Sequence, residues 1–210
     1  MNKFWERFFF VVCYITQGSS YLSPKAYGIM HRLHHAYTDT PDDPHSPSYD
    51  KNFLTMMWRT RNVYNSILSN NMEVEDKFTR NIPTWKSFDW WANSWVSRVL
   101  WIGLYVWFYI AFAPSLWWFI LLPFQIVMGP LHGVIINWFA HKYGERNFDT
   151  DNTSRNLFKV DWLMLGEGYH NNHHMYPSRT NFASQKGEID FCYPVIVVLD
   201  KLKVIQVNKP

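Results

Sequence analysis

The sequence predicts an all-α fold in which an integral membrane helical hairpin carries a cytoplasmic helical cap. The 43 residues from Val99 to His141 contain no Asp, Glu, Lys or Arg, whereas one membrane crossing needs about 20 apolar residues. Polar sequence that holds all 20 Lys and Arg residues flanks this stretch on both sides. Aromatic residues make up 19% of the chain, which is typical of segments that lie at a lipid–water boundary.

The uncharged stretch is long enough for two crossings and a turn. We predict a first crossing over 99–113, extended backwards by Trp95 and a snorkelling Arg98, a turn at Ala113-Pro114-Ser115, and a second crossing over 116–137. Lys and Arg lie before and after the hairpin and not in its turn, so the positive-inside rule places both polar parts in the cytoplasm. The chain is then one domain, with cap parts at 1–98 and 138–210 and the membrane part at 99–137. A buried hairpin in a soluble protein fits less well, because it would need a polar face.

The remaining segments complete the cap. We predict helices over 4–16, 22–36 and 52–72, the second with Ser23 as N-cap and Pro24 in its first turn. Residues 39–47 hold three prolines and three aspartates and predict a loop. Residues 193–207 predict either a surface helix or a strand pair. The net charge of +3 is too small to indicate a nucleic-acid partner.

Six of the nine histidines fall in two clusters with the pattern His-x-x-His-His. Positions i, i+3 and i+4 of a helix lie on one face, so each cluster aims three imidazoles at one region. Neutral imidazole is the commonest metal ligand among side chains. The six candidate ligands are His31, His34, His35, His170, His173 and His174.

The end of the second predicted crossing adds a seventh candidate. His141 closes the uncharged stretch, and Asn137 lies one turn earlier on the same helical face. His132 is about half a turn out of phase with His141 in a straight helix, which favours a structural role. His45 lies in the proline-rich segment and is interpreted as organising that loop rather than binding a metal.

The ligand types in the two clusters limit which metals can bind but do not identify one metal. Imidazole suits zinc, copper, iron and nickel. Structural zinc takes four protein ligands and catalytic zinc about three, so seven histidines indicate two ions. The His-Glu-x-x-His pattern of zinc proteases is absent from the sequence. Two metal ions held by histidines beside a membrane hairpin favour a reaction of O₂ with a lipid.

Three groups of residues together carry a resemblance to a known enzyme family. They are His31-Arg32-Leu33-His34-His35 with Thr38-Asp39-Thr40 and Asp43-Pro44-His45; Asn137 with His141 and Gly144; and Gly166-Glu167-Gly168-Tyr169-His170-Asn171-Asn172-His173-His174. With these motifs the chain resembles the membrane fatty-acid desaturases, particularly the acyl-CoA Δ9 (stearoyl-CoA) type and its bacterial relatives. The resemblance runs from near residue 1 to about residue 200.

The resemblance implies O₂-dependent desaturation of a fatty acyl chain (acyl-CoA or acyl-lipid) at two iron ions (Fe²⁺). In the family nine histidines hold the irons, and an Asn holds a water near one of them. The implied partners are a fatty acyl substrate, the lipid membrane and an electron donor such as ferredoxin or cytochrome b5. The implied location is a membrane with the site facing the cytoplasm, the inner membrane if the source is bacterial. Carried over, the metal ligands are His31, His34, His35, His141, His170, His173 and His174, with Asn137 holding the water.

Acidic side chains near the clusters are candidates for orienting the imidazoles from outside the ligand set. Asp39 and Asp43 follow the first cluster, and Glu167 precedes the second. Each of them could equally cap a helix. No catalytic residue beyond the metal ligands is predicted.

One part of the family pattern is missing. The family has an earlier box, two histidines separated by four residues, after its first membrane hairpin, and no histidine precedes His31. We therefore expect an N-terminally truncated gene product in which Met1 is an internal methionine. A stop codon directly before Met1, with no in-frame histidine box, would contradict this. Seven ligands would leave the iron pair under-coordinated, which puts the activity of this exact chain in question.

Other functions use related residues. A di-iron lipid hydroxylase or ketolase would use the same ligands and differ only in its product. A zinc-dependent membrane hydrolase would need fewer histidines. A membrane haem or metal-transport protein would place histidines within the spans, whereas both clusters lie outside the uncharged stretch.

Overall fold

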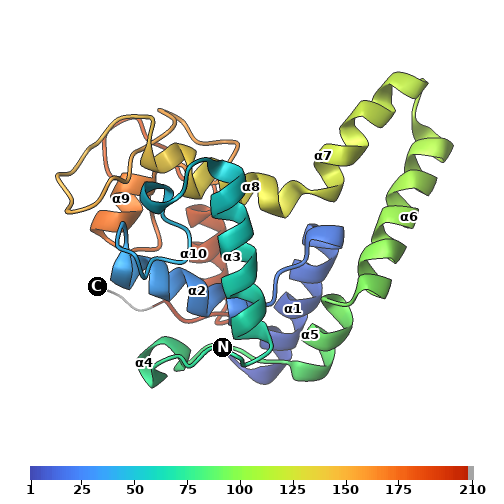
Figure 1. Ribbon diagram of the computed structural model, residues 1–210, viewed down its shortest axis with the longest axis horizontal. Helices are drawn as coiled ribbons and strands as arrows, with labels where there is room; N and C mark the ends of the chain where they lie inside the picture. The colour runs from blue at the N-terminus through green and yellow to red at the C-terminus, as the bar shows by residue number, and fades with distance from the viewer. Residues whose placement is uncertain (208–210) are drawn as a thin grey trace.

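The computed structural model describes residues 1–207 and consists of helices joined by loops, which confirms the all-α prediction (Figure 1). Within these residues the β pairing is limited to three isolated bridges. The α-helices are α1 (Lys3–Gln17), α2 (Pro24–Tyr37), α3 (Phe53–Leu68), α4 (Asp76–Thr79), α5 (Lys86–Ala92), α6 (Trp95–Phe112), α7 (Leu122–Ile126), α8 (Met128–Asn137), α9 (His170–Met175) and α10 (Tyr193–Lys201). The 3-10 helices are η1 (Gly18–Ser20), η2 (Pro47–Tyr49), η3 (Leu116–Leu121) and η4 (Phe139–His141).

The apolar core of the cap lies between α2, α3 and α4. Ser23 caps α2 by accepting a hydrogen bond from the Ala26 N–H, and Pro24 occupies the first turn, as predicted. The apolar residues of α2 recur at helical spacing and so form one stripe. This packing fixes the rotation of α2, and with it the directions of the histidines on that helix. The core residues are Ala26, Ile29, Met30, Leu33, Tyr64, Ile67 and Phe78.

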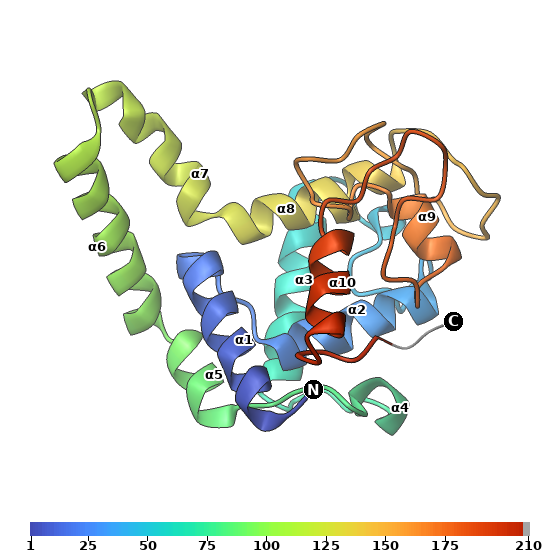
Figure 2. The ribbon, with the colours of Figure 1, turned by 180° about the vertical axis from the view of Figure 1, so that it is seen from behind.

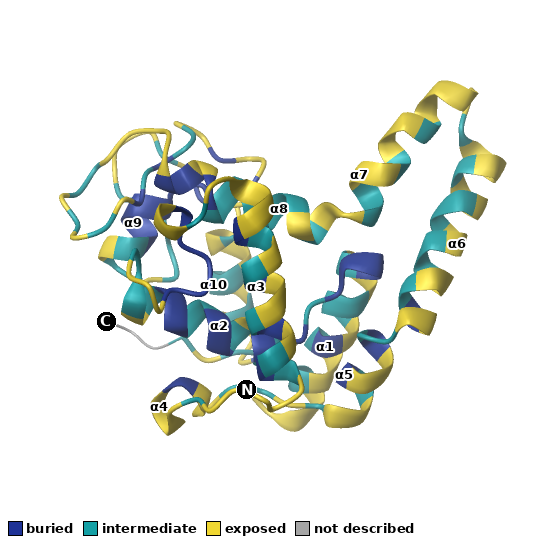
Figure 3. Cartoon of the chain, in the orientation of Figure 1, coloured by how far each residue is buried: buried dark blue, intermediate teal, exposed yellow. Residues whose placement is uncertain are grey.

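α6 and α7 form a hairpin that projects away from the cap (Figure 1, Figure 2). α6 has 18 residues with a mean hydropathy of 1.4, and only 6% of them are buried. Figure 3 shows the exposed surface that runs along both arms. At 1.5 Å per residue α6 is about 27 Å long, close to the thickness of a bilayer's hydrocarbon core. In the described part of the chain, α6 is the one unbroken helix long and apolar enough to cross a membrane.

The second predicted crossing, 116–137, is not one continuous helix. It is divided into η3, α7 and α8, and the parts Leu116–Ile126 and Met128–His141 are bent by 61° relative to one another. Two prolines account for the breaks, because proline lacks an N–H and fits best in the first turn of a helix. Pro123 lies in the first turn of α7 and Pro130 in the first turn of α8. This arm counts as a second span only if the bent pair is taken together.

Side chains of α6 bind the base of the hairpin to the cap. The Arg98 guanidinium donates to the carbonyl oxygens of Ser19 and Tyr21, and the hydroxyls of Ser97 and Tyr14 lie 2.7 Å apart. The donors of Arg98 are directed to backbone carbonyls of the cap, and its snorkelling at a membrane surface stays a prediction. These bonds set the position of the hairpin relative to α1.

The other predicted segments form with small shifts. The helices predicted over 4–16 and 52–72 are α1 and α3, and residues 39–46 form the expected loop. Residues 193–201 form α10, which selects the helix over the strand pair. The division of the domain at residues 98 and 137 stays a prediction.

Candidate metal centre

Three elements far apart in the sequence bring the predicted histidines together. α2 and α9 each present a His-x-x-His-His triplet, and η4, which follows α8, presents the seventh histidine. Each triplet is divided between two groups of ligand atoms, which we call the four-histidine cluster and the three-histidine cluster. Their members are His34, His141, His170 and His174 in the first, and His31, His35 and His173 in the second.

The four-histidine cluster is closely spaced and mostly buried. The Nε2 atoms of His34 and His174 lie 3.2 Å apart, and those of His170 and His174 lie 3.1 Å apart. His141 approaches from η4, with its Nε2 atom 3.0 Å from that of His170. All four ligand atoms lie within 4.8 Å of one another, and only His174 is not fully buried.

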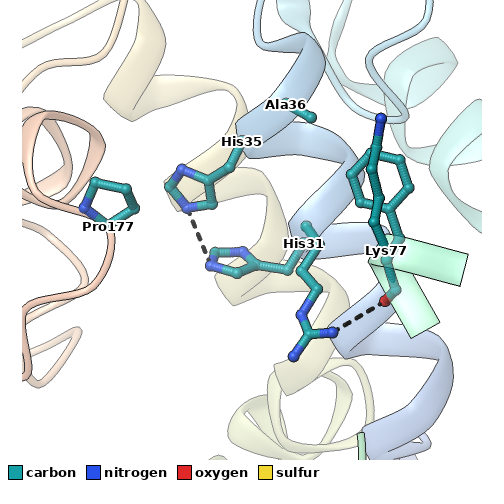
Figure 4. A pocket seen from close by; sticks show the side chains of 7 residues that line it. His31, His35, Ala36, Lys77 and Pro177 are labelled. Carbon is teal, nitrogen blue, oxygen red and sulfur yellow. Dashed lines mark hydrogen bonds between the residues drawn. The ribbon is translucent and has the colours of Figure 1, made fainter. Parts of the chain in front are cut away.

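The three-histidine cluster is a triangle of Nε2 atoms. The distances are 3.1 Å between His31 and His35, 2.8 Å between His35 and His173, and 3.3 Å between His173 and His31. Figure 4 shows His31 and His35 projecting from α2 toward one another. His31 and His35 are only partly buried, so this cluster is more accessible than the other.

Hydrogen bonding among the imidazoles does not explain these contacts. A neutral imidazole carries one N–H, and three Nε2 atoms in a triangle cannot all be satisfied by donors that each point in one direction. Two nitrogens that lie about 2.1 Å from one ion, roughly 90–109° apart, are separated by about 3.0–3.4 Å. The spacing in both clusters is close to that value, so each cluster fits one metal ion.

Burial keeps the imidazoles in the form that binds metal. Loss of solvation lowers the pKa of His34, His170 and His174 well below the usual value. It also lowers the pKa of His31, and that of His35 to about 4. Neutral imidazole offers the lone pair that a metal needs. At neutral pH these histidines are therefore ready to bind an ion without losing a proton.

A carboxylate and a hydroxyl hold two imidazoles of the four-histidine cluster from outside. Both carboxylate oxygens of Asp43 lie 3.0 Å from His34 Nδ1, and Asp43 also accepts from the Asp39 N–H. Thr153 Oγ1 lies 3.0 Å from His141 Nδ1 and donates to the Asp39 carboxylate. Such bonds direct Nε2 toward an ion and raise its basicity. Asp43 thus takes the predicted orienting role directly, and Asp39 takes it through Thr153.

The three-histidine cluster has no comparable outer contact within residues 1–207. His173 Nδ1 is buried without a hydrogen-bond partner there, as is His170 Nδ1 in the other cluster. Glu167 hydrogen-bonds through its backbone N–H to the Met164 carbonyl, and none of its hydrogen bonds there reaches a histidine. The cluster opens into a shallow cavity of about 560 Å³ (Figure 4). The lining residues are His31, Arg32, His35, Ala36, Lys77, Phe78 and Pro177.

The role of His45 stays a prediction, because the residue also belongs to a third group of possible metal ligands, with His34 and Asp43. Its ring is buried and packs against the ring of His34 with centroids 4.3 Å apart. Neither ring nitrogen has a hydrogen-bond partner in the described residues, so the ring does not organise the loop by hydrogen bonding. Arg59 of α3 does so instead, by donating to the carbonyl oxygens of Asp43 and Ser46.

Two further predicted residues lie at the edge of the site. Asn137 ends α8, and its role in holding a water stays a prediction. His132 belongs to neither cluster, in keeping with a structural role. Two residues that support the site, Arg59 and Thr153, were not predicted. The sequence gives no signal for either, because neither shares a helical face with the histidines it supports.

Comparisons with known proteins agree with this geometry. A family model described as fatty acid desaturase matches residues 1–184. Delta-9 acyl-lipid desaturase 1 of Arabidopsis thaliana is 25% identical over 205 residues, covering 93% of this chain and 61% of the relative. The sn-1 stearoyl-lipid 9-desaturase of Synechocystis sp. is 26% identical over 204 residues, covering 94% and 59%. An acyl-CoA 5-desaturase of Anemone leveillei is 27% identical over 203 residues, covering 96% and 60%.

These relatives are longer than the chain, which spans about three fifths of their length. No solved structure gives a significant match. The family model nevertheless covers most of the chain, including all seven clustered histidines. The chain therefore belongs to the fatty acid desaturase family.

Proposed function

We propose that this chain is the ligand-bearing core of a membrane enzyme that desaturates fatty acyl chains with O₂ at two iron ions, in unsaturated fatty acid biosynthesis. The observation that carries the proposal is the pair of clusters, in which seven Nε2 atoms surround two positions. The names of the relatives include acyl-lipid, stearoyl-lipid and acyl-CoA desaturases. They support an acyl substrate and leave its carrier and the position of the double bond open.

The choice of iron rests on the donor set and on the reaction. Both clusters offer nitrogen ligands, which suit iron as well as zinc and copper. An unactivated C–H bond has no acidic proton and no leaving group. A bound iron pair, given O₂ and two external electrons, supplies the strong one-electron oxidant that this bond needs. A zinc hydrolase would need only one such cluster, so that function does not explain the second cluster.

The residues of the chain hold the ions and place them near the lipid. Asp43 and Thr153 orient two of the imidazoles, and Asn137 is proposed to hold a water near one of the two ions. The short helix η4, which ends at His141, begins two residues after the end of α8, so the four-histidine cluster lies at the cap end of the returning arm of the hairpin. An apolar acyl chain would reach this place from the membrane without crossing water.

The distribution of charge supports a topology. Eleven Lys and Arg residues lie in 1–98 and nine in 142–210, with none between Val99 and His141. We therefore place α6 and the bent segment from η3 to α8 in the membrane, and the cap in the cytoplasm. If the source is bacterial, this membrane is the inner membrane. An electron donor such as ferredoxin or cytochrome b5 would then meet the cap from the cytoplasm.

The length of the relatives bears on the ligand count. The family's first box would add two histidines to the seven present. The three-histidine cluster has room for them, because it opens into a cavity.

Expression in a desaturase-deficient host tests the function. The chain is produced alone and together with any in-frame coding sequence upstream, and the acyl chains are profiled by mass. We expect the longer form to yield acyl chains that have lost two hydrogens. His170→Ala should abolish this product, whereas His132→Ala, a histidine outside both clusters, should leave it.

The alternatives give different products. A gain of oxygen would indicate a hydroxylase or ketolase. An unchanged lipid profile, with one zinc and no iron in the purified protein, would indicate the hydrolase. A product that persists in His170→Ala would show that the ligand assignment is wrong.

A further inference from the structure

Helix α9 carries three of the seven clustered histidines and begins without a cap of its own. It spans only six residues, starts at His170, and its N-cap residue Tyr169 makes no side-chain capping bond. The first four residues of α9 are buried, so water cannot easily satisfy the free N–H groups of its first turn. Buried N–H groups without partners are rare in folded proteins. An acceptor from elsewhere in the chain is therefore required.

Asn156 supplies that acceptor from the preceding loop. Its Oδ1 atom accepts hydrogen bonds from the backbone N–H groups of Asn171, at 2.9 Å, and Asn172, at 3.3 Å. Its Nδ2 group donates to Asn172 Oδ1 at 2.9 Å. The residue is 6% exposed. One side chain therefore binds both the backbone and a side chain of the first turn of α9.

The backbone of Asn156 is itself held in place. Its N–H donates to the Glu145 carbonyl at 2.7 Å, and its carbonyl accepts from the Glu145 N–H at 2.9 Å. Gly144 packs so closely behind it that a Cβ there would collide with the Asn156 carbonyl, and Gly144 has a φ of +112°, which favours glycine. The cap is therefore a fixed point rather than a mobile loop contact.

We propose that Asn156 is a positioning residue for both metal ions. It fixes the rotation of α9, so that His170 and His174 face the four-histidine cluster and His173 faces the three-histidine cluster. A rotation of about 20° would move a side-chain tip about 6 Å from the helix axis by roughly 2 Å. Metal–ligand distances tolerate only about 0.2 Å. This inference rests on the proposed two-ion centre and adds a residue that touches neither ion.

The test measures metal binding rather than activity. Purified full chain is titrated with Co²⁺, and stoichiometry, affinity and the visible absorption of bound Co²⁺ are recorded for Asn156→Ala, Asn156→Ser and Asn156→Asp. Serine can serve one of the two N–H groups, and alanine serves neither. Aspartate keeps an acceptor for both, but it loses the Nδ2 donor and turns a buried carboxylate oxygen toward Asn172 Oδ1. We expect the alanine variant to bind Co²⁺ at least about tenfold more weakly at both clusters with an altered spectrum, and the serine variant to lie between it and the parent. The aspartate variant should also bind more weakly than the parent, because its carboxylate oxygen repels Asn172 Oδ1.

A matched control separates positioning from general destabilisation. Asn93→Ala removes a side chain that accepts from Tyr64 and donates to the Asp89 carbonyl at the base of the hairpin, away from the histidines. It should lower the thermal unfolding midpoint and leave the Co²⁺ spectrum unchanged. If the alanine variant does not fold, the Co²⁺ affinity and spectrum of the serine variant, compared with those of Asn93→Ala, decide.

Two results would overturn the proposal. One is an alanine or serine variant that binds two Co²⁺ ions with the parent's spectrum and affinities. The other is a serine variant whose Co²⁺ affinity falls by no more than that of Asn93→Ala, which would assign the effect to general destabilisation. Neither result depends on whether the enzyme makes a double bond, so desaturation can be disproved while the positioning role stands.

Discussion

The two histidine clusters use the same kind of ligand and the same pair of helices, yet they are built differently. The four-histidine cluster draws on α2, η4 and α9, and carries outer bonds from Asp43 and Thr153. Within residues 1–207, the three-histidine cluster draws on α2 and α9 alone and opens into a cavity. The spacing of histidines makes a site possible in both places. The contacts behind the imidazoles decide how firmly each site is held.

The two triplets are divided between the clusters in a reciprocal way. On α2 the first and last histidines, His31 and His35, go to the three-histidine cluster, and His34 goes to the other. On α9 the first and last, His170 and His174, go to the four-histidine cluster. Residues at i and i+4 therefore share an ion, while the residue at i+3 crosses to the neighbouring one. This arrangement ties both ion positions to the relative rotation of two helices.

The largest expected effect concerns the order in which the clusters fill. We expect the 210-residue chain to bind one Zn²⁺ tightly at the four-histidine cluster and a second more weakly. His141→Ala should weaken the tight event by more than about 100-fold, because changes outside the ligand shell alone cost 10–100-fold. His31→Ala should remove only the weak event. Calorimetric titration of the purified protein measures both, with His132→Ala as the control.

Equal affinity of the two ions would contradict the expected difference between the clusters. The expected order would also be contradicted if His31→Ala abolished the tight binding event and His141→Ala did not, since the clusters would then fill in the reverse order.

A smaller effect is expected at Asp43, whose carboxylate supports His34. In Asp43→Asn an amide replaces the charged acceptor of the His34 Nδ1 proton, so the ligand loses basicity and orientation. We expect the four-histidine cluster to bind Zn²⁺ about 10–100-fold more weakly, with no change at the three-histidine cluster. Asp42→Asn makes the same substitution at the exposed neighbouring residue and should have no effect. Equal weakening at both clusters would show that Asp43 acts on the fold rather than on His34.

The sequence predicted the ligands better than it predicted their arrangement. Helical spacing predicts that a triplet faces one way, and the boundary of the uncharged stretch singles out His141. Each triplet is divided between two ions because of how α2 packs beside α9. A pattern within one helix cannot predict that packing. The supports Thr153 and Asn156 lie in a loop without periodicity, more than ten residues from the histidines they support.

In the hairpin, too, the composition predicts which segments form but not how they are arranged. The absence of charge from Val99 to His141 predicts α6 and the turn after it. It does not predict the break near Val127, because an average over apolar residues is insensitive to where a helix ends. Pro123 and Pro130 lie in the first turns of α7 and α8. Their spacing was therefore visible in the sequence, but the 61° bend depends on how the arm packs.

The two hydrogen bonds of one hydroxyl are tested at Thr153. Thr153→Val keeps the shape of the side chain and removes the hydroxyl that bridges His141 Nδ1 and Asp39. The loss of one such bond is worth about 1 kcal/mol, or roughly fivefold in affinity, and we expect that weakening at the four-histidine cluster. Competition with a chelator measures it, and Thr153→Ser should restore the parent affinity. A serine variant as weak as valine would assign the effect to packing.

The smallest effect on metal binding is expected beside the three-histidine cluster, at Glu167. Tyr27 stacks on His31 with ring centroids 5.9 Å apart and lies within the electrostatic influence of Glu167. Burial, with the carboxylates of Asp161 and Asp190, raises the pKa of Glu167 to about 7. Below pH 7 the side chain is therefore neutral and does not give this cluster the kind of anionic support that Asp43 gives the other.

The pH dependence of stability checks this assignment. The unfolded chain releases the Glu167 proton near its ordinary pKa of 4.5, whereas the folded chain keeps it up to about 7. Between those values the folded state binds more protons, so the free energy of unfolding falls as pH rises. Glu167→Gln cannot titrate, and should be more stable than the parent by about 1–3 kcal/mol above pH 7 and little different at pH 4. Denaturant unfolding of the metal-free protein measures this. If the variant instead loses Zn²⁺ from the three-histidine cluster, then that cluster does depend on a carboxylate, and the contrast between the two clusters is one of degree.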